Sequence, residues 1–166
     1  MNSPPVIERS LASDAEIVTQ IAQSSKRHWG YPEAWIQQWT AALTITPAAI
    51  ATHPTYHVRE DGAIVGFYLL RLDGNEAHLD HLWIAPPVIG KGWGRLLFEH
   101  SEQVARENSA RRIVIVSDPN AEGFYRRMGA LRCGEEAAPV DGQPRFLPRL
   151  EKILSPSPAT LPPKKQ

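Results

Sequence analysis

The sequence predicts an α/β fold whose central strands run mainly antiparallel, and three observations support this. Asp61-Gly62 and Asp73-Gly74 separate three strand-like segments, and an Asp-Gly pair is a strong signal for a hairpin turn. A glycine-rich loop follows the third segment and precedes a stretch with helical spacing of apolar residues. The β-branched run at 112–116 is typical of a buried strand. Together they predict a sheet of hairpins against which helices pack.

The first fifty residues are predicted to form a short strand, at 6–10, and then helices. Ser13-Asp14-Ala15-Glu16 has the Ser-x-x-Glu form of a capping box, which predicts that a helix begins there and ends near 24–29. Gly30-Tyr31-Pro32 then breaks the chain. A second helix has one apolar face, formed by Trp35, Ile36, Trp39 and Leu43. Thr46-Pro47 resembles an N-cap with proline at the first helical position, which predicts another short helix.

The rest of the chain alternates strands and helices. The three hairpin strands are predicted at 56–59, 63–72 and 77–84, a helix at 95–107, a strand at 112–116, a helix at 121–128, and strands at 131–134 and 145–153. Gly66 indicates a bulge or a close approach inside its strand. Asn120 is placed to cap the second of these helices and Gly129 to end it. Pro148 indicates that the last strand is an edge strand or contains a bulge.

Length and composition predict one domain over residues 1–154 and a flexible Pro- and Ser-rich tail over 155–166. Lys plus Arg and Asp plus Glu are both 18, so the net charge is zero. A zero balance gives no general attraction to nucleic acid or membranes, which leaves a small molecule as the expected partner. The single cysteine, Cys133, excludes an internal disulfide and a Cys-based zinc site, and we expect it to be buried and inert, with no metal bound. No signal-peptide pattern and no membrane-spanning apolar run are visible, so the cytoplasm is the expected location.

The loop Ile89-Gly90-Lys91-Gly92-Trp93-Gly94 lies between a strand and a helix, where bare backbone N–H groups can bind an anion. Its spacing excludes two well-known nucleotide loops. A Rossmann loop needs Gly-x-Gly-x-x-Gly, but its last position falls on Arg95 or Leu97, and the P-loop pattern is absent. Two interpretations remain: a phosphate-binding loop, or a tight turn that packs the helix on the strand.

Two motifs resemble those of the GNAT superfamily of N-acetyltransferases, and the tract from Ser25 to Tyr31 resembles a subgroup of its small bacterial-type members. The family's loop pattern, Arg/Gln-x-x-Gly-x-Gly/Ala, falls on Ile89 to Gly94, after a strand that ends in Ile84-Ala85-Pro86. The second motif, Asn, a spacer, Phe-Tyr and a later Gly, matches Asn120 to Tyr125 with Met128-Gly129-Ala130. The resemblance extends over 6–153. It implies a mixed, mostly antiparallel central sheet of six or seven strands with helices on both faces.

The resemblance also implies a function: transfer of an acetyl group from acetyl-CoA to a primary amine of a small molecule, an amino acid derivative or a peptide. Acetyl-CoA is then a cosubstrate, no nucleic acid or membrane is a partner, and the protein is a monomer or a homodimer. The alternative is a non-catalytic acyl-CoA-binding or regulatory domain. Ile89, which stands where the family has Arg or Gln, favours this alternative, and Tyr125 opposes it.

The family's cofactor site can be carried over residue by residue. In the family, one strand splays from the next, so we expect a splay between Leu82–Ile84 and Ile113–Val116, with the pantetheine arm along the first. The expected cofactor-binding residues are Leu82, Trp83, Ile84, Ile89, Gly90, Lys91, Gly92, Trp93, Gly94, Arg95, Asn120 and Phe124. With Ile89 in the loop, the backbone and the cations of Lys91 or Arg95 are left to hold the pyrophosphate.

Four residues are candidates for proton transfer. Tyr125 falls where the family has the acid that protonates the leaving thiolate, or else it is half of an aromatic core pair with Phe124. His78, Asp80 and His81 are candidates for the base, or else ordinary surface polar residues. Strand alternation places His78 and Asp80 on one face and His81 on the other, although a bulge would change this. Asp80 is the first choice, as base or as a partner for the amine cation.

The acceptor wall is predicted at His28, Trp29 and Tyr31, where the family has a wall of the acceptor site. The aromatic rings there form an apolar or cation-binding surface, or they simply pack two helices together. Arg145 either holds an acidic group of the substrate or is an ordinary solvated charge.

Overall fold

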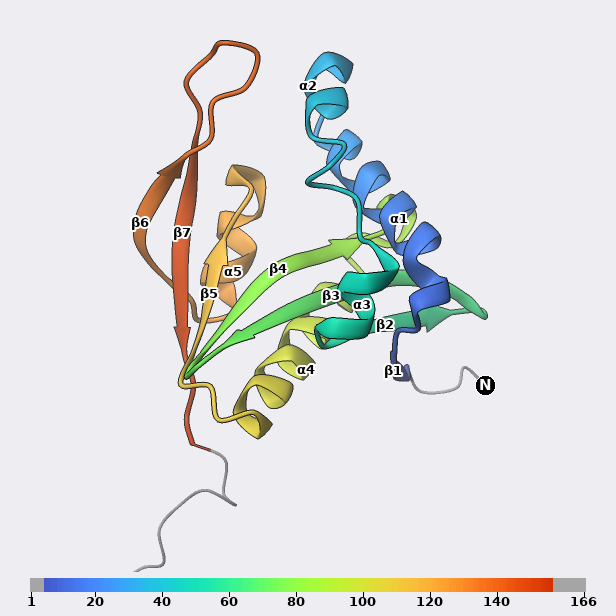
Figure 1. The fold of residues 1–166 in the computed structure, drawn as a ribbon, viewed down its shortest axis with the longest axis vertical. Helices are drawn as coiled ribbons and strands as arrows, with labels where there is room; N and C mark the ends of the chain where they lie inside the picture. Colours follow the sequence, from blue (N-terminus) through green and yellow to red (C-terminus); the bar gives the residue numbers. More distant parts are fainter. Residues whose placement is uncertain (1–4, 157–166) are drawn as a thin grey trace, which may run out of the picture.

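A computed structural model describes residues 5–156 of the chain and shows one seven-stranded sheet in the order β1-β2-β3-β4-β5-β7-β6 (Figure 1). The strands are β1 (Ile7–Arg9), β2 (Thr55–Glu60), β3 (Ala63–Asp73), β4 (Glu76–Ile84), β5 (Arg112–Val116), β6 (Leu131–Ala137) and β7 (Phe146–Ile153). The helices are α1 (Ala15–His28), α2 (Glu33–Gln38), α3 (Pro47–Thr52), α4 (Trp93–Glu107) and α5 (Glu122–Arg127). All neighbouring strands pair antiparallel except β4 and β5, which are parallel. The predicted mixed α/β fold is confirmed.

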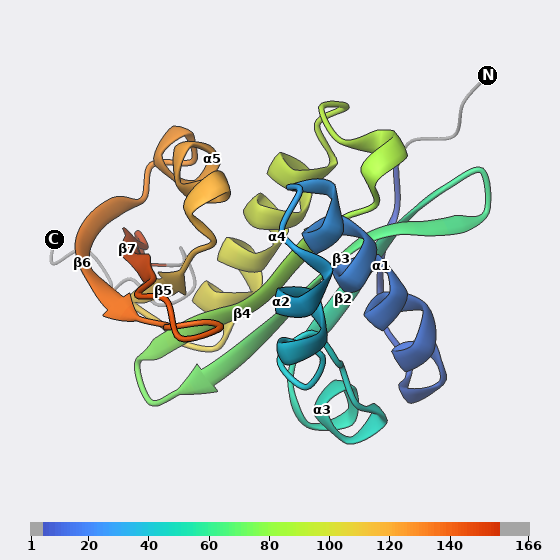
Figure 2. The same cartoon turned by 90° about the horizontal axis from the view of Figure 1, so that it is seen from above.

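The sheet separates two apolar layers, and β3 contributes to both by alternation. Phe67 and Leu69 pack against α1 and α3 on one face, while Tyr68 and Leu70 pack against α4 on the other. Figure 2 shows α4 on the far side of β3 and β4 from α1. Helices therefore cover both faces, as the resemblance implied.

Local signals predicted most elements, and two cap assignments are wrong. The first helix begins at Ala15 after a tight turn at Ala12–Asp14, so Ser13 lies before the helix; the carboxylate of Asp14 accepts from the Leu11 N–H at 2.7 Å instead. Asp118, not Asn120, caps the turn before α5, because its carboxylate accepts from the Asn120 N–H at 2.8 Å.

The second helix is shorter than predicted: α2 ends at Gln38, and Trp39 and Leu43 lie in the turns that follow. The short third helix is as predicted, because Thr46 accepts from the Ala49 N–H at 3.1 Å and Pro47 is its first residue. The predicted close approach at Gly66 is also confirmed, since a Cβ there would lie 2.7 Å from Cδ1 of Ile84.

The last strand is neither an edge strand nor bulged at Pro148. β7 lies between β5 and β6, and Pro148 is tolerated because β5 ends at Val116, opposite Arg149, so no N–H is needed from the proline there. The irregularity lies across the ladder in β6, where Cys133 is the extra residue between the pairs of Arg132 and Gly134. Cys133 is exposed, which corrects the prediction of a buried thiol, because β6 is the edge strand.

The single domain over 1–154 stays a prediction, and most of the predicted tail, 157–166, lies outside the described residues. Within residues 5–156, no helix combines the length and apolarity needed to span a bilayer.

Candidate active site

The central feature of the site is a gap in the sheet between β4 and β5. These strands pair only from Glu76 to His78 and from Arg112 to Val114, and then they diverge. A cavity of about 470 Å³ lies along the unpaired part of β4, between the glycine loop, the end of β5 and α5. The predicted splay is present, but it begins at Leu79 and Ile115, since Ile113 and Val114 are still paired. Unpaired strand backbone beside a cavity can hydrogen-bond an extended ligand.

The glycine loop lines the end of this cavity nearest α4. Gly90 and Gly92 have φ angles of 89° and 92°, which a side chain would strain. Gly94 is needed for a different reason: a Cβ there would lie 3.3 Å from the Phe124 ring. The loop therefore presents the N-terminus of α4, a helix of 15 residues, to the cavity with little side-chain cover.

Three cationic side chains near the loop can take the place of the Arg or Gln that the family has at the position of Ile89. Lys91 pairs with Glu60 at 3.3 Å and Arg95 with Glu99 at 2.9 Å, and both cations are more than half exposed. Exposed pairs of this kind contribute little, so both side chains can turn toward an anion at low cost. Arg95 lines the cavity, whereas Lys91 does not; Arg127, which sequence reasoning missed, lines it too and forms no ion pair with residues 5–156. Arg127 lies one helical turn after Gly123 in α5, and this spacing was the only feature of the sequence that could have indicated it as a cavity residue.

Tyr125 lines the same cavity from α5 and is 7% exposed. Its ring packs edge-on against Phe98 and Phe124, so it belongs to the core as well as to the cavity. Burial raises the pKa of the hydroxyl, and the nearby carboxylate of Asp118 raises it further. The phenol is therefore fully protonated at neutral pH, the state that a proton donor needs.

A bulge at Asp80 rearranges the polar residues of β4. Leu69 pairs with His81 and Leu70 with Leu79, which leaves Asp80 as the extra residue. The bulge that would change the alternation is therefore present, so His81 does not face away from Asp80 as strict alternation predicted. His81 stacks on Phe67 on the α1 side of the sheet, and Asp80 pairs at 2.9 Å with Arg71.

The three candidate bases differ in access to the cavity, which Asp80 and His81 line and His78 does not. Nδ1 of His81 accepts from the indole N–H of Trp83 at 3.1 Å, so the proton of the neutral ring resides on Nε2. Burial lowers the pKa of His81, which keeps the ring neutral at pH 7. His78 lies beside Glu76 at 3.3 Å. Oδ1 of Asp80 has no hydrogen-bond partner within residues 5–156, so it is available to a ligand.

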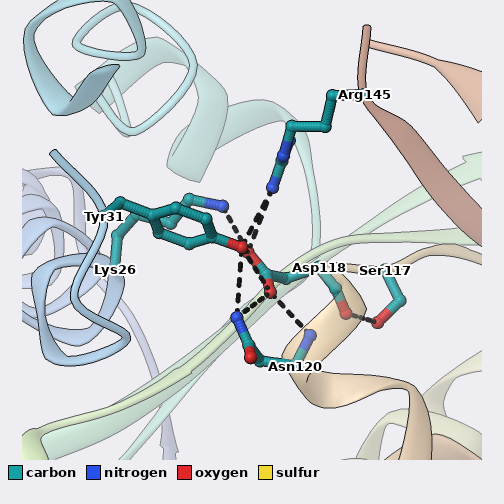
Figure 3. Close-up of polar contacts among 6 residues, drawn as sticks. All are labelled: Lys26, Tyr31, Ser117, Asp118, Asn120 and Arg145. Carbon is teal, nitrogen blue, oxygen red and sulfur yellow. Dashed lines mark hydrogen bonds and ion pairs between the residues drawn. The ribbon is translucent and has the colours of Figure 1, made fainter. Parts of the chain in front are cut away.

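On the acceptor side, Trp29 lines the cavity together with Ser25, whereas His28 and Tyr31 do not. Tyr31 instead packs with Trp35 and Trp39. Its hydroxyl points at Asp118, the residue that follows β5 by two positions (Figure 3). The predicted segment does border the cavity, but of His28, Trp29 and Tyr31 only Trp29 lines it.

Asp118 is the centre of a network that joins segments far apart in the sequence (Figure 3). Its carboxylate binds the ammonium of Lys26 at 2.5 Å, accepts from the Tyr31 hydroxyl at 3.0 Å and lies 3.4 Å from Nη2 of Arg145. The side-chain amide of Asn120 donates to Asp118 at 3.0 Å and to the Tyr31 oxygen at 3.1 Å. Sequence reasoning missed Lys26 and Asp118; a carboxylate two positions after a buried strand was the one local signal.

The charged side chains of the network, Lys26, Asp118 and Arg145, are largely buried, and this shifts the pKa values of Lys26 and Asp118. Burial alone would raise the pKa of Asp118, but the Lys26 ammonium and its hydrogen bond hold the pKa below the ordinary value. Burial lowers the pKa of Lys26, against the opposing effect of Asp118. Asp118 and Asn120 also line the cavity, so this ionic network forms part of its wall.

Fold and cavity together define a mixed α/β protein in which a glycine loop at a helix N-terminus and an open strand edge line one cavity. The model of the family described as "Acetyltransferase (GNAT) family" matches residues 16–130, and the chain belongs to this family.

Three similar proteins illustrate the range of the family. The chain is 34% identical over 90 residues to streptothricin acetyltransferase of Streptomyces lavendulae, covering 51% of this chain and 48% of that one. It is 36% identical over 87 residues to the peptidyl-lysine N-acetyltransferase YjaB of Escherichia coli (strain K12), covering 52% and 55%. The chain thus spans about half the length of these relatives. The PaiA N-acetyltransferase of Thermoplasma acidophilum, solved in complex with coenzyme A, has the same fold, with a TM-score of 0.72, 18% identity and coverage of 91% and 99%.

The residues present fit coenzyme A. The loop glycines leave a cradle at the N-terminus of α4 for a pyrophosphate, and the free edge of β4 suits an amide-bearing arm. The indole Nε1 of Trp93 is buried without a partner in the described part of the chain, which is the kind of donor that a ligand satisfies.

Proposed function

We propose that the chain is an N-acetyltransferase that moves an acetyl group from acetyl-CoA to a primary amine by direct attack. The observation that carries the proposal is the splay of β4 and β5 beside the glycine loop, with Tyr125 on the wall of the resulting cavity. Family membership supports the cosubstrate, and the acetyltransferase names of the two relatives support the reaction class.

In this proposal, three sets of residues hold the cosubstrate. The N–H groups at the start of α4 and the side chains of Lys91, Arg95 and Arg127 bind its phosphates. The backbone of Leu82 to Ile84 pairs with its arm, and Phe124, Trp93 and Asn120 shape the wall. The bound thioester supplies an acetyl group activated for attack by an amine.

The reaction needs two proton transfers, and we assign each of them to one side chain. A C–N bond forms between the amine and the acetyl carbon, the C–S bond breaks, and the thiolate must take up a proton while the amine loses one. Tyr125 donates from its hydroxyl, since its raised pKa keeps it protonated. Asp80 takes the proton of the amine through its free Oδ1. His81, whose Nδ1 lone pair is engaged by Trp83, donates from Nε2 and orients the acceptor.

A thermal-shift measurement and a turnover assay test the proposal together. Saturating acetyl-CoA should raise the melting temperature, because a ligand that binds only the native state stabilises it. Tyr125→Phe should lower kcat by about 100-fold and leave this shift intact. The matched control is Tyr56→Phe, a half-buried tyrosine of β2 outside the cavity lining.

The outcomes separate the enzyme from its alternative. A thermal shift without thiol release against any amine would identify a non-catalytic acyl-CoA-binding domain, which Ile89 favours. If saturating acetyl-CoA does not raise the melting temperature, acetyl-CoA is not the cosubstrate. The cytoplasmic location and the monomeric or dimeric state stay predictions, to be measured by cell fractionation and light scattering.

A further inference from the structure

The network around Asp118 holds one more positive charge than negative. Lys26 and Arg145 bring two cations, and their side chains are only 9% and 12% exposed. Asp118 brings the one carboxylate, and Tyr31 and Asn120 are neutral partners. A cation held largely away from water needs a counter-charge, because the loss of hydration disfavours an unpaired charge. The network therefore lacks one anion.

The unused hydrogen-bonding capacity belongs mainly to Arg145. Only its Nη2 is engaged, by the Tyr31 oxygen at 3.2 Å and by Asp118 at 3.4 Å. Within residues 5–156, its Nε and Nη1 have no hydrogen-bond partner. A guanidinium with free N–H groups in a fixed plane is the side chain best suited to bind a carboxylate.

The aromatic rings nearby are not free to bind a cation. The Lys26 ammonium lies 4.4 Å from the ring centre of Trp39 and 4.9 Å from that of Tyr31. The Arg145 guanidinium lies 4.7 Å and 5.4 Å from the same two rings. The protein's own cations thus already satisfy these rings. A cationic tail of an acceptor would meet two like charges here instead of an empty aromatic surface.

This positive site adjoins the acceptor end of the cavity. Ser25 and Trp29 of the α1 region and Asp118 and Asn120 line the cavity. Lys26 and Arg145 are not lining residues but contact Asp118 directly, Arg145 from the position just before β7 (Figure 3). Asp118 is paired with Lys26, and Asp80, whose Oδ2 pairs with Arg71, has its free Oδ1 for the reacting amine. Among residues 5–156, the cavity lining contains no further carboxylate for a second ammonium group.

We infer that the acceptor is an amine that also carries a carboxylate, which Arg145 binds beside Lys26 while the amine faces Asp80. This inference rests on the proposed function and names its substrate class. The same excess positive charge favours the neutral form of the acceptor amine, which is the nucleophilic form, since nearby like charge disfavours protonation.

Matched pairs of acceptors test the inference. Thiol release is measured for the twenty standard L-amino acids and for the ω-amino acids β-alanine, 4-aminobutyrate and 6-aminohexanoate, each against its carboxamide. We expect at least one acid to exceed its carboxamide by about tenfold or more in kcat/KM, the effect of one charge-assisted contact. Arg145→Gln should abolish that preference, mainly through KM, and Arg145→Lys should restore part of it. Arg149→Gln, which removes a partly exposed arginine of β7 outside the cavity lining, is the control and should leave the preference unchanged.

Three outcomes would overturn the inference. The first is turnover of carboxamides or diamines as fast as, or faster than, the matching acids. The second is a carboxylate preference that survives Arg145→Gln with its KM unchanged. The third is no turnover of any amine with an intact acetyl-CoA thermal shift, which overturns the proposed function and this inference with it. In the first two outcomes the enzyme is active, so failure of the inference is distinguishable from failure of the proposed function.

Discussion

At the scale of single residues, the protonation state of Tyr125 leads to a prediction about pH. Burial and Asp118 raise its pKa above the ordinary value of about 10, so its acid form is lost only at higher pH than for a free phenol. The wild-type kcat at saturating substrates should therefore not fall between about pH 7 and about pH 9. A pH profile of kcat checks this, and a decline with a midpoint inside that range would exclude Tyr125 as the donor.

The role of Asp80 gives a second prediction at this scale. Asp80→Asn keeps the shape of the side chain but removes the proton acceptor, so kcat/KM at neutral pH should fall by about 100-fold. The defect should shrink as pH rises toward the pKa of the acceptor amine, where the amine no longer needs a base. Asp73→Asn, an exposed aspartate of the adjacent strand, should have no such effect. If the Asp80→Asn defect is the same at every pH, Asp80 has a structural role and is not the base.

Local motifs, and the family resemblance that they carry, allowed the prediction of the cavity residues that lie close in sequence, but not of those that meet through folding. The glycine spacing and the Asn120-to-Tyr125 motif identified the loop and the proposed donor. Lys26 and Arg145 are 119 positions apart, and no local pattern pairs them with Asp118. Their ionic network exists only because α1, the end of β5 and the start of β7 converge.

At the scale of elements, hairpin signals predicted the strands well, but the bulge in β4 could not be read from β4 alone. A bulge is a property of a strand pair: Leu69 and Leu70 of β3 face His81 and Leu79, and Asp80 is the residue left over. Alternation along one strand therefore assigned His81 to the wrong face. The order of the last two strands in the sheet could not be predicted from the sequence either, because β7 inserts between β5 and β6.

The loop before α4 carries a prediction at the same scale. Gly92 has a φ of 92°, so Gly92→Ala places a side chain in a disfavoured conformation and should destabilise the fold by about 1–2 kcal/mol. Strain relief would move the first N–H groups of α4, so the acetyl-CoA thermal shift should also decrease. Gly134→Ala is the control, since Gly134 has no positive φ and nothing within 4 Å of an added Cβ. Equal melting temperatures and equal shifts for both variants would refute the strained-loop account.

At the scale of the whole molecule, Asp118 connects parts of the protein that the sheet alone does not hold together. Asp118→Asn preserves the shape of the side chain but leaves Lys26 and Arg145 as two buried cations without a carboxylate. Breaking a buried ion pair on one side costs about 3–5 kcal/mol, so the free energy of unfolding should fall by that amount near neutral pH. Denaturant unfolding measures this, with Asp141→Asn as control, because Asp141 is exposed and its φ of 51° suits asparagine equally well.

The same carboxylate makes the stability of the molecule depend on pH, in a direction that follows from its shift. The pKa of Asp118 is lower in the folded than in the unfolded chain, so its contribution is complete above the unfolded pKa of about 3.9 and is lost as pH falls through the folded pKa. The difference in stability between wild type and Asp118→Asn should therefore be largest at neutral pH and shrink below about pH 4. Unfolding curves from neutral to acid pH test this. A difference that stays constant over that range would mean that the ionised carboxylate contributes nothing and that the variant is destabilised by altered packing alone.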